Sequence, residues 1–268
     1  MKTKTRFLIG MVEILLVPGA VLAQSDFSGA WRIDISKTSF SGNPQIFVLK
    51  KGEYQCKSCV PSLAIKADGA DHAVTGNPYF DSISIKIVDD RTVEETRKKN
   101  GRTVSTSRIV VSPDGNSATF QFNDSSRTNG DPIVGSGSLT RVGKAKQSSG
   151  KHMLSGEWQI SKYANLSENA STFTLGVDGD TLRMTTPTGQ SYAANFNGSD
   201  APYHGDVGVT SVSVLRLGND TFTETDKRDG KPVRERRFMV NPHDTKTMVI
   251  IDSDLLTGTT EDLNADKQ

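Results

Sequence analysis

The chain has 268 residues, a formal net charge of +1 at pH 7, 34% hydrophobic residues and 24 glycines. Its near-neutral balance of mixed charges argues against a nucleic-acid or anionic-membrane partner, because both require a basic patch. Frequent glycine, with short alternating runs of Thr, Ser and Val, favours an all-β protein with many turns over a helical one.

The first 23 residues predict a signal peptide. Three basic residues precede an apolar run from 7 to 17, and Val21-Leu22-Ala23 fits the positions that a signal peptidase cleaves. The alternative is a short buried N-terminal helix. Cleavage before Gln24 removes three basic residues and one acidic residue, so the net charge changes from +1 to −1. We therefore expect an exported protein, periplasmic or secreted, with no membrane span in the mature chain.

The chain carries an internal duplication. Residues 76–121 correspond without a gap to residues 205–250, at a constant offset of 129. The turn dipeptides Asn100-Gly101 and Asp229-Gly230 coincide in this alignment, and each predicts a two-residue hairpin turn. The duplication predicts two units, at 24–142 and 154–268, joined by a polar linker at 143–153.

Each unit is predicted to contain seven or eight short strands. In the first unit we expect strands at 27–35, 46–51, 63–67, 81–88, 92–98, 103–111, 118–122 and 133–142. In the second unit we expect strands at 154–161, 221–227, 233–240, 247–251 and 256–262. The alternation of Ile83, Ile85 and Ile87 with polar residues predicts that one face of this strand is buried. The fold class is therefore all-β, with two tandem antiparallel up-and-down meanders that form barrels or half-barrels.

Cys56 and Cys59 form a Cys-x-x-Cys motif. In an exported chain this spacing predicts a disulfide. A zinc site would need a second pair of ligands, a c-type haem would need His where Val60 stands, and a thiol oxidoreductase would need a following helix. We therefore expect a disulfide, with no metal and no cofactor.

Both units open with a Gly-x-Trp motif, in Gly29-Ala30-Trp31 and Gly156-Glu157-Trp158. The motif resembles the opening strand of lipocalins and their calycin relatives, and the phrase that contains Trp31 also resembles exported bacterial proteins of unassigned activity. The resemblance implies two lipocalin-like barrels, in which each Trp packs beneath a basic residue of the last strand. Arg141 stands where that residue is expected in the first unit. The stretch 257–261 offers none, so the same closure is not predicted for the second unit.

Charged residues on the repeated hairpin offer the candidate polar sites. Glu95 and Glu224 recur at equivalent positions, as do Arg108 and Arg237. We expect a structural salt bridge across each hairpin, Glu95 with Arg108 and Glu224 with Arg237, rather than a catalytic acid. No serine stands in a nucleophile motif, and the four histidines lack ligand spacing, so no catalytic residue is predicted.

These features predict a non-catalytic, exported, lipocalin-like protein that binds a small apolar ligand inside an apolar barrel. The alternative is a structural or protein-interaction module of the cell envelope, in which side chains fill both barrels. The sequence names no ligand-binding residue. The volume inside the barrels distinguishes the two hypotheses.

Overall fold

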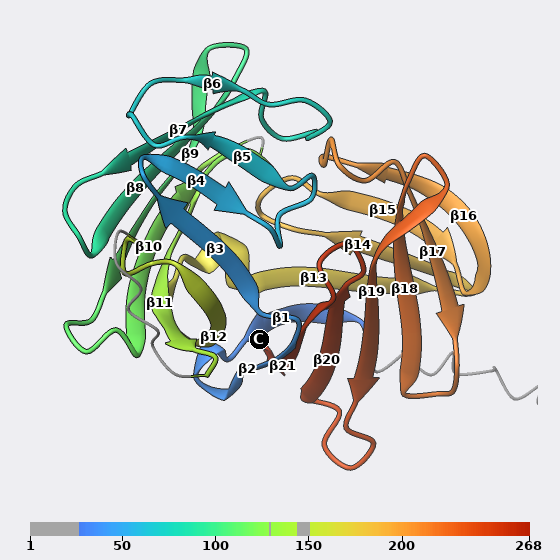
Figure 1. The fold of residues 1–268 in the computed structure, drawn as a ribbon. Helices are drawn as coiled ribbons and strands as arrows, with labels where there is room; N and C mark the ends of the chain where they lie inside the picture. Colours follow the sequence, from blue (N-terminus) through green and yellow to red (C-terminus); the bar gives the residue numbers. More distant parts are fainter. Residues whose placement is uncertain (1–26, 129, 144–150) are drawn as a thin grey trace, which may run out of the picture.

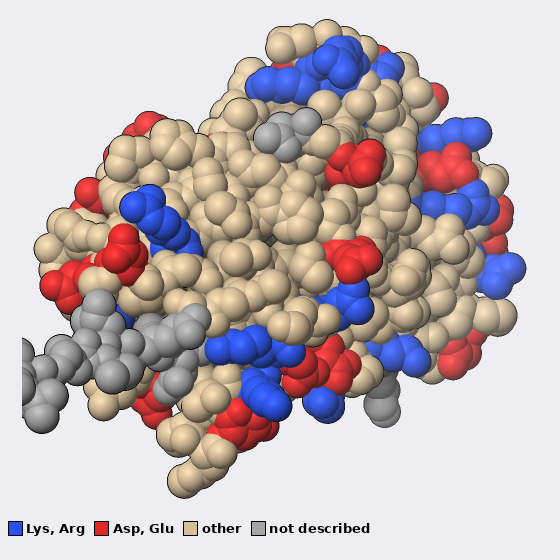
Figure 2. Space-filling model, turned by 180° about the vertical axis from the view of Figure 1, so that it is seen from behind, with Lys and Arg blue, Asp and Glu red and all other residues tan. Residues whose placement is uncertain are grey.

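The computed structural model describes residues 27–128, 130–143 and 151–268, and within them the chain forms two antiparallel β-sheets (Figure 1). One sheet is closed into a barrel and the other nearly so, which confirms the predicted all-β class. The described residues include no helix of the length and apolarity required to cross a membrane. Basic and acidic side chains are interspersed over the face shown in Figure 2.

The first sheet has the strand order β5-β4-β3-β12-β11-β10-β9-β8-β7-β6. Its strands are β3 (Gln45–Lys50), β4 (Glu53–Cys56), β5 (Leu63–Lys66), β6 (His72–Ala73), β7 (Ser82–Ile87), β8 (Thr92–Lys99), β9 (Arg102–Val111), β10 (Ser117–Asp124), β11 (Ile133–Arg141) and β12 (Gly156–Leu166). An isolated bridge between Asp68 and Lys86 links the end of β5 to β7, so this sheet nearly closes.

The second sheet runs from β1 through β13 to β21, and β1 also pairs with β21, which closes the barrel. Its strands are β1 (Gly29–Ile33), β2 (Ser39–Gly42), β13 (Thr172–Asp178), β14 (Thr181–Thr185), β15 (Ser191–Asn195), β16 (Asn197–His204), β17 (Ser211–Arg216), β18 (Thr221–Arg228), β19 (Lys231–Val240), β20 (Thr247–Asp254) and β21 (Thr259–Lys267). The short helices η1 (Ile35–Lys37) and α1 (Glu168–Ser171) lie in connections.

The two sheets exchange their opening strands. The N-terminal strands β1 and β2 pair with β21 in the second sheet, whereas β12, which opens the second predicted unit, pairs with β11 and β3 in the first (Figure 1). The units 24–142 and 154–268 thus contribute strands to each other's sheet.

Arg141 closes the floor of the first barrel, but beneath it lies Trp158 and not Trp31. The guanidinium carbon lies 4.1 Å from the centroid of the Trp158 ring, and the two residues are directly opposite in the ladder. The arginine also donates three hydrogen bonds of 2.6–2.8 Å to the carbonyls of Gly115, Met153 and Ser155. At Gly156, φ is +143°, and a Cβ would lie 2.1 Å from the guanidinium, so the motif requires glycine.

The second barrel has the same closure, contrary to the expectation from residues 257–261. Trp31 lies opposite Lys267, whose Nζ is 4.9 Å from the centroid of its ring. Strand β21 continues beyond the predicted end at 262 and carries this lysine at its terminus. Each indole N–H donates a 2.8 Å hydrogen bond to the carbonyl four residues earlier, Phe27 for Trp31 and Leu154 for Trp158. The two floors are therefore equivalent in geometry.

The repeated hairpins form as predicted, with positive φ at Asn100 and Asp229 (51° and 53°) and at the glycines that follow them. After the next turn the two repeats are shifted by one residue. Val111 and Val240 are equivalent, but Val111 lies opposite Ala118, whereas Val240 lies opposite Met248 and not the equivalent residue Thr247. The gap-free equivalence predicted up to residue 121 therefore ends at this loop. The expectation of seven or eight strands was too low, since short strands such as β4 and β6 gave no pattern.

The predicted disulfide joins Cys56 to Cys59 at the end of β4. Ile83 and Ile85 are fully buried, whereas Ile87 at the strand end is 37% exposed. The signal peptide and residues 144–150 of the linker lie outside the described residues. The remaining end of the linker lies along β3, where the N–H of His152 donates to the carbonyl of Leu49 at 3.0 Å.

The strand exchange predicts which cation shields which tryptophan. When Trp158 is replaced by Phe, the fluorescence comes from Trp31. In that background Lys267→Ala should shift the emission to longer wavelength, because water reaches the ring, while Arg141→Ala should not. When Trp31 is replaced by Phe instead, Arg141→Ala should shift the emission of Trp158 and Lys267→Ala should not. Arg141→Ala should also lower the free energy of unfolding by about 1–3 kcal/mol, since three carbonyls lose their donor. A response of Trp31 to Arg141→Ala would contradict the exchange.

Candidate ligand-binding site

The interior of the second barrel changes from apolar to charged along each of four neighbouring strands. Next to the floor lie Phe222, Phe238, Ile250 and Leu263, all buried. Two or four residues further from the floor, the same strands carry charged side chains, which point inward because side chains two residues apart share a face of the strand. These residues are Glu224 and Asp226 on β18, Arg234 and Arg236 on β19, Asp252 on β20 and Glu261 on β21. The expectation of an apolar interior was therefore wrong for this barrel.

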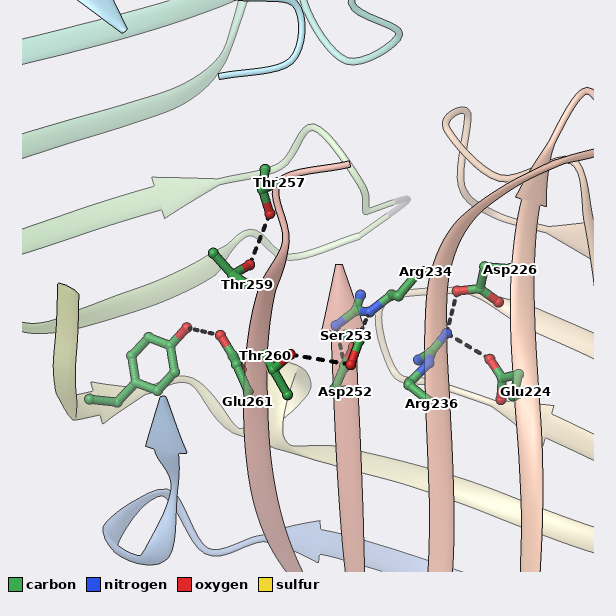
Figure 3. A network of polar contacts seen from close by, with 11 residues as sticks. Glu224, Asp226, Arg234, Arg236, Asp252, Ser253, Thr257, Thr259, Thr260 and Glu261 are labelled. Carbon is green, nitrogen blue, oxygen red and sulfur yellow. Dashed lines mark hydrogen bonds and ion pairs between the residues drawn. The ribbon is translucent and has the colours of Figure 1, made fainter. Parts of the chain in front are cut away.

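These charged residues form an ion-pair network (Figure 3). Nη2 of Arg236 lies 2.6 Å from Oε1 of Glu224 and 2.5 Å from Oδ2 of Asp226. Arg234 pairs with both oxygens of Asp252, and its Nε donates at 2.6 Å. At the far side, the hydroxyl of Tyr163 donates to Glu261 at 3.3 Å. One guanidinium thus serves two buried carboxylates.

Two polar atoms of this network have no hydrogen-bond partner among the described residues. They are Oδ1 of Asp226 and Nε of Arg236, and both are buried. Glu224 and Asp226 are only 1% and 2% exposed. An unsatisfied polar atom costs about 1–3 kcal/mol and more for a charged group, so the arrangement is incomplete without a further partner.

Burial raises the pKa of Glu224 to about 8, partly offset by the positive charge of Arg236 and reinforced by the negative charge of Asp226. The hydroxyl of Tyr192 donates a 2.5 Å hydrogen bond to Oε2 of Glu224. Burial, and then the neighbouring Glu224, raise the pKa of Tyr192 well above its usual value. Strongly shifted groups at the wall of a cavity are typical of functional sites.

The charged layer lines a cavity of about 530 Å³ between the two barrels. Its acidic residues are Asp124, Asp206, Glu224, Asp226, Asp252, Asp254 and Glu261, and its basic residues are Arg127, Arg228, Arg234 and Arg236. Apolar and aromatic side chains from both barrels, including Phe122, Phe173 and Phe238, complete the lining. The volume lies within the range of about 300–1,000 Å³ that is usual for small-molecule sites.

Residues of both sheets meet at the rim of this cavity. The guanidinium of Arg127 stacks 4.2 Å above the ring of Tyr79, and the side-chain amide of Gln190 donates to the carbonyl of Arg127. The hydroxyl of Tyr79 lies against Gly208, where a Cβ would be 1.9 Å away. Burial raises the pKa of Tyr79 to about 12. The first barrel therefore completes a site whose charged wall belongs to the second.

The first barrel is filled at the equivalent level. Phe120 and Phe122 lie over Gly137 and Gly135, where a Cβ would meet either ring at 2.5 Å. Ser107 is the equivalent of Arg236 in the first repeat. Phe122 lies opposite Ser107, whereas Asp252 lies opposite Arg236. Glu95 points inward like Glu224 and pairs at 2.6 Å with Arg97, which stands at the position of Asp226. The duplicated scaffold thus carries aromatic rings in one barrel and carboxylates in the other.

The two predicted salt bridges across the hairpins do not form. In the ladder Glu94 lies opposite Arg108, and these two residues pair on the outer face, whereas Glu95 points inward. In the second barrel Arg236 lies opposite Glu224, and Arg237 lies opposite Thr223. Opposite residues share a face, so pairs offset by one position project to different sides of the sheet.

Sequence reasoning missed most of the site. Asp226 and Asp252 gave no signal, and the basic cluster of Arg234 with Arg236-Arg237 suggested solvated strand ends, although the spacings Glu224-x-Asp226 and Arg234-x-Arg236 repeat every second residue in predicted strands. That period indicates charges on a single face. Among the described residues, no three His, Cys, Asp or Glu side chains are placed to hold a metal ion.

Comparisons with family models, curated proteins and solved structures found no match to this chain.

The buried Glu224 makes stability depend on pH. Its pKa is raised on folding, so between about pH 4.5 and 8 the folded protein holds a proton that the unfolded chain has lost. The free energy of unfolding should therefore fall as pH rises through this window, by at most about 1.4 kcal/mol per pH unit for this group. Glu224→Gln should reduce that slope, measured by urea denaturation at several pH values.

The exposed Glu53 provides the control for that experiment. Glu53→Gln also removes one carboxylate, but it should leave the slope as in the wild type. Equal slopes in Glu224→Gln and the wild type would show that Glu224 is not the buried acid.

The ion pairs of the two barrels should differ in energetic importance. Arg236→Met leaves Glu224 and Asp226 buried without a cation and should lower the free energy of unfolding by about 3–5 kcal/mol. Arg108→Met removes a pair with Glu94 on the partly exposed outer face and should cost about 0–1 kcal/mol. Chemical denaturation measures both, and similar losses would contradict a desolvated network in the cavity.

Proposed function

We propose that the protein is a non-catalytic, lipocalin-like binding protein that is exported and holds one small molecule in the cavity between its barrels. The observation that carries this proposal is the cavity of about 530 Å³ with buried, unsatisfied polar atoms in its wall. In a protein that used its barrels only as scaffold, these unsatisfied atoms would destabilise the fold without serving a function.

The lipocalin-like character is supported by the closure of each barrel floor. A Gly-x-Trp strand faces a cation from the last strand of the sheet in both barrels, as the resemblance implies. Export is supported by the Cys56–Cys59 disulfide, because disulfides persist in oxidising compartments.

The lining supports an amphipathic ligand rather than a wholly apolar one. A purely apolar molecule would bury Asp226 against hydrocarbon and leave its Oδ1 unsatisfied. A molecule with a polar group and an apolar body would satisfy that atom and also cover Phe173 and Phe238.

A second candidate function is favoured by the filled first barrel. The stacked rings of Phe120 and Phe122 make this barrel a solid body, which suits a structural or protein-interaction module of the cell envelope. In that case the cavity would be only the junction between two packed barrels.

Native mass spectrometry of the mature protein from its own host, together with uptake of the neutral dye Nile red, tests the binding function. Leu256 lies at the cavity and is 42% exposed, so Leu256→Trp should obstruct the cavity without disturbing the core. We expect this variant to lose the co-purifying mass and to bind Nile red roughly tenfold more weakly, a loss of about 1.4 kcal/mol.

Leu217→Trp is the matched control, because Leu217 is 49% exposed and does not line the cavity. It should behave as the wild type. A wild-type protein with no bound mass and no dye uptake would contradict the binding function and support the envelope module.

A further inference from the structure

The cavity has a surplus of negative charge. Seven acidic residues and four arginines line it, and no lysine or histidine is among its described lining residues. The outer face in Figure 2, by contrast, mixes both signs. The field inside the cavity therefore favours a positively charged group over a negatively charged one.

Asp226 and Glu224 share one of these arginines. Arg234 pairs with Asp252, whereas Arg236 contacts both Glu224 and Asp226, which are each almost fully buried. Oδ1 of Asp226 still lacks a hydrogen-bond donor among the described residues. A carboxylate oxygen is an acceptor, so the missing partner must bring an N–H or O–H group.

A competing reading is that an anion binds to the unsatisfied Nε of Arg236. An anion placed there would meet a guanidinium that already pairs with Asp226, in a cavity whose seven acidic residues outnumber its four arginines. The charges that remain repel an anion. The unsatisfied Nε therefore does not reverse the preference for a cation.

The first barrel indicates what the second lacks. At the position of Asp226 it carries Arg97, which pairs with Glu95 and lies 5.0 Å from the ring of Phe80. One repeat thus places its own guanidinium against the inward glutamate and an aromatic ring. In the second repeat Glu224 is the equivalent glutamate, but Asp226 stands in place of the arginine, and both line the cavity.

We propose that the ligand of this cavity is a small organic cation, an amine or guanidine with an apolar body, whose charged group is held by Asp226 and Glu224. The inference rests on the proposed binding function. The ammonium or guanidinium donates to the unsatisfied Oδ1 of Asp226, and the apolar body lies against aromatic side chains such as Phe173, Phe238 and Tyr203.

A matched series of probes tests the charge preference. Calorimetry on the full mature chain compares 2-phenylethylamine, 2-phenylethanol and 3-phenylpropionate, and then octylamine, octanol and octanoate. We expect each amine to bind roughly 10- to 100-fold more tightly than its alcohol, the range of one charge-assisted hydrogen bond, and each acid more weakly than the alcohol.

Two substitutions at Asp226 locate the effect. Asp226→Asn should weaken amine binding roughly 10- to 100-fold and change alcohol binding little, because it removes the charge and keeps the shape. Asp226→Arg imitates the first barrel and should abolish amine binding. Asp178→Asn, an exposed carboxylate on β13 outside the cavity, should have no effect. Near-ultraviolet circular dichroism checks that each variant is folded. If a variant does not fold, the comparison of amines, alcohols and acids on the wild-type protein decides the charge preference.

The outcomes separate this inference from the function on which it rests. Alcohols or acids that bind as tightly as amines would overturn the cation preference and leave the binding function intact. Amine binding that survives Asp226→Asn in a folded variant would also overturn it. If no probe binds and Nile red does not enter the cavity, both the inference and the binding function fail.

Discussion

The contact between a buried tryptophan and a cation at the floor of each barrel is the interaction on which the rest of the structure depends. Trp158 lies beneath Arg141 and Trp31 beneath Lys267, and each pair joins the opening strand to the last strand of a sheet. A glycine two residues before each Trp gives the cation its space. Both openings carry the same motif, and each completes the sheet that holds the other strands of the opposite repeat.

The exchange ties the two barrels into one body and creates the space between them. The first barrel places Tyr79, Arg127 and Tyr163 at the rim of a cavity whose charged wall belongs to the second. The hydrogen bond from Tyr163 to Glu261 joins β12 to β21, strands of different sheets. The site therefore exists only when both barrels are formed and docked, although each barrel has its own apolar core.

Duplication allowed the two interiors to diverge while the scaffold stayed the same. Inward positions of the hairpin strands carry Arg97 and Ser107 in one repeat and Asp226 and Arg236 in the other. The first set is compatible with an interior filled by aromatic rings. The second set lies in a cavity wall with more acidic residues than arginines, which is costly for stability and is understandable where a ligand provides the compensating charge.

The sequence by itself determined the all-β class, the duplication, the two hairpins, the disulfide and the Gly-x-Trp openings. These are local features, since turn dipeptides, strand period and short spacings act between neighbours in the chain. Only the tertiary structure decided which sheet receives β1 and β12, that Glu224 pairs with Arg236 rather than Arg237, and that at the same level one interior carries aromatic rings and the other a charged layer beside a cavity. Each of these depends on register between distant strands, and a shift of one residue reverses the face on which a side chain lies.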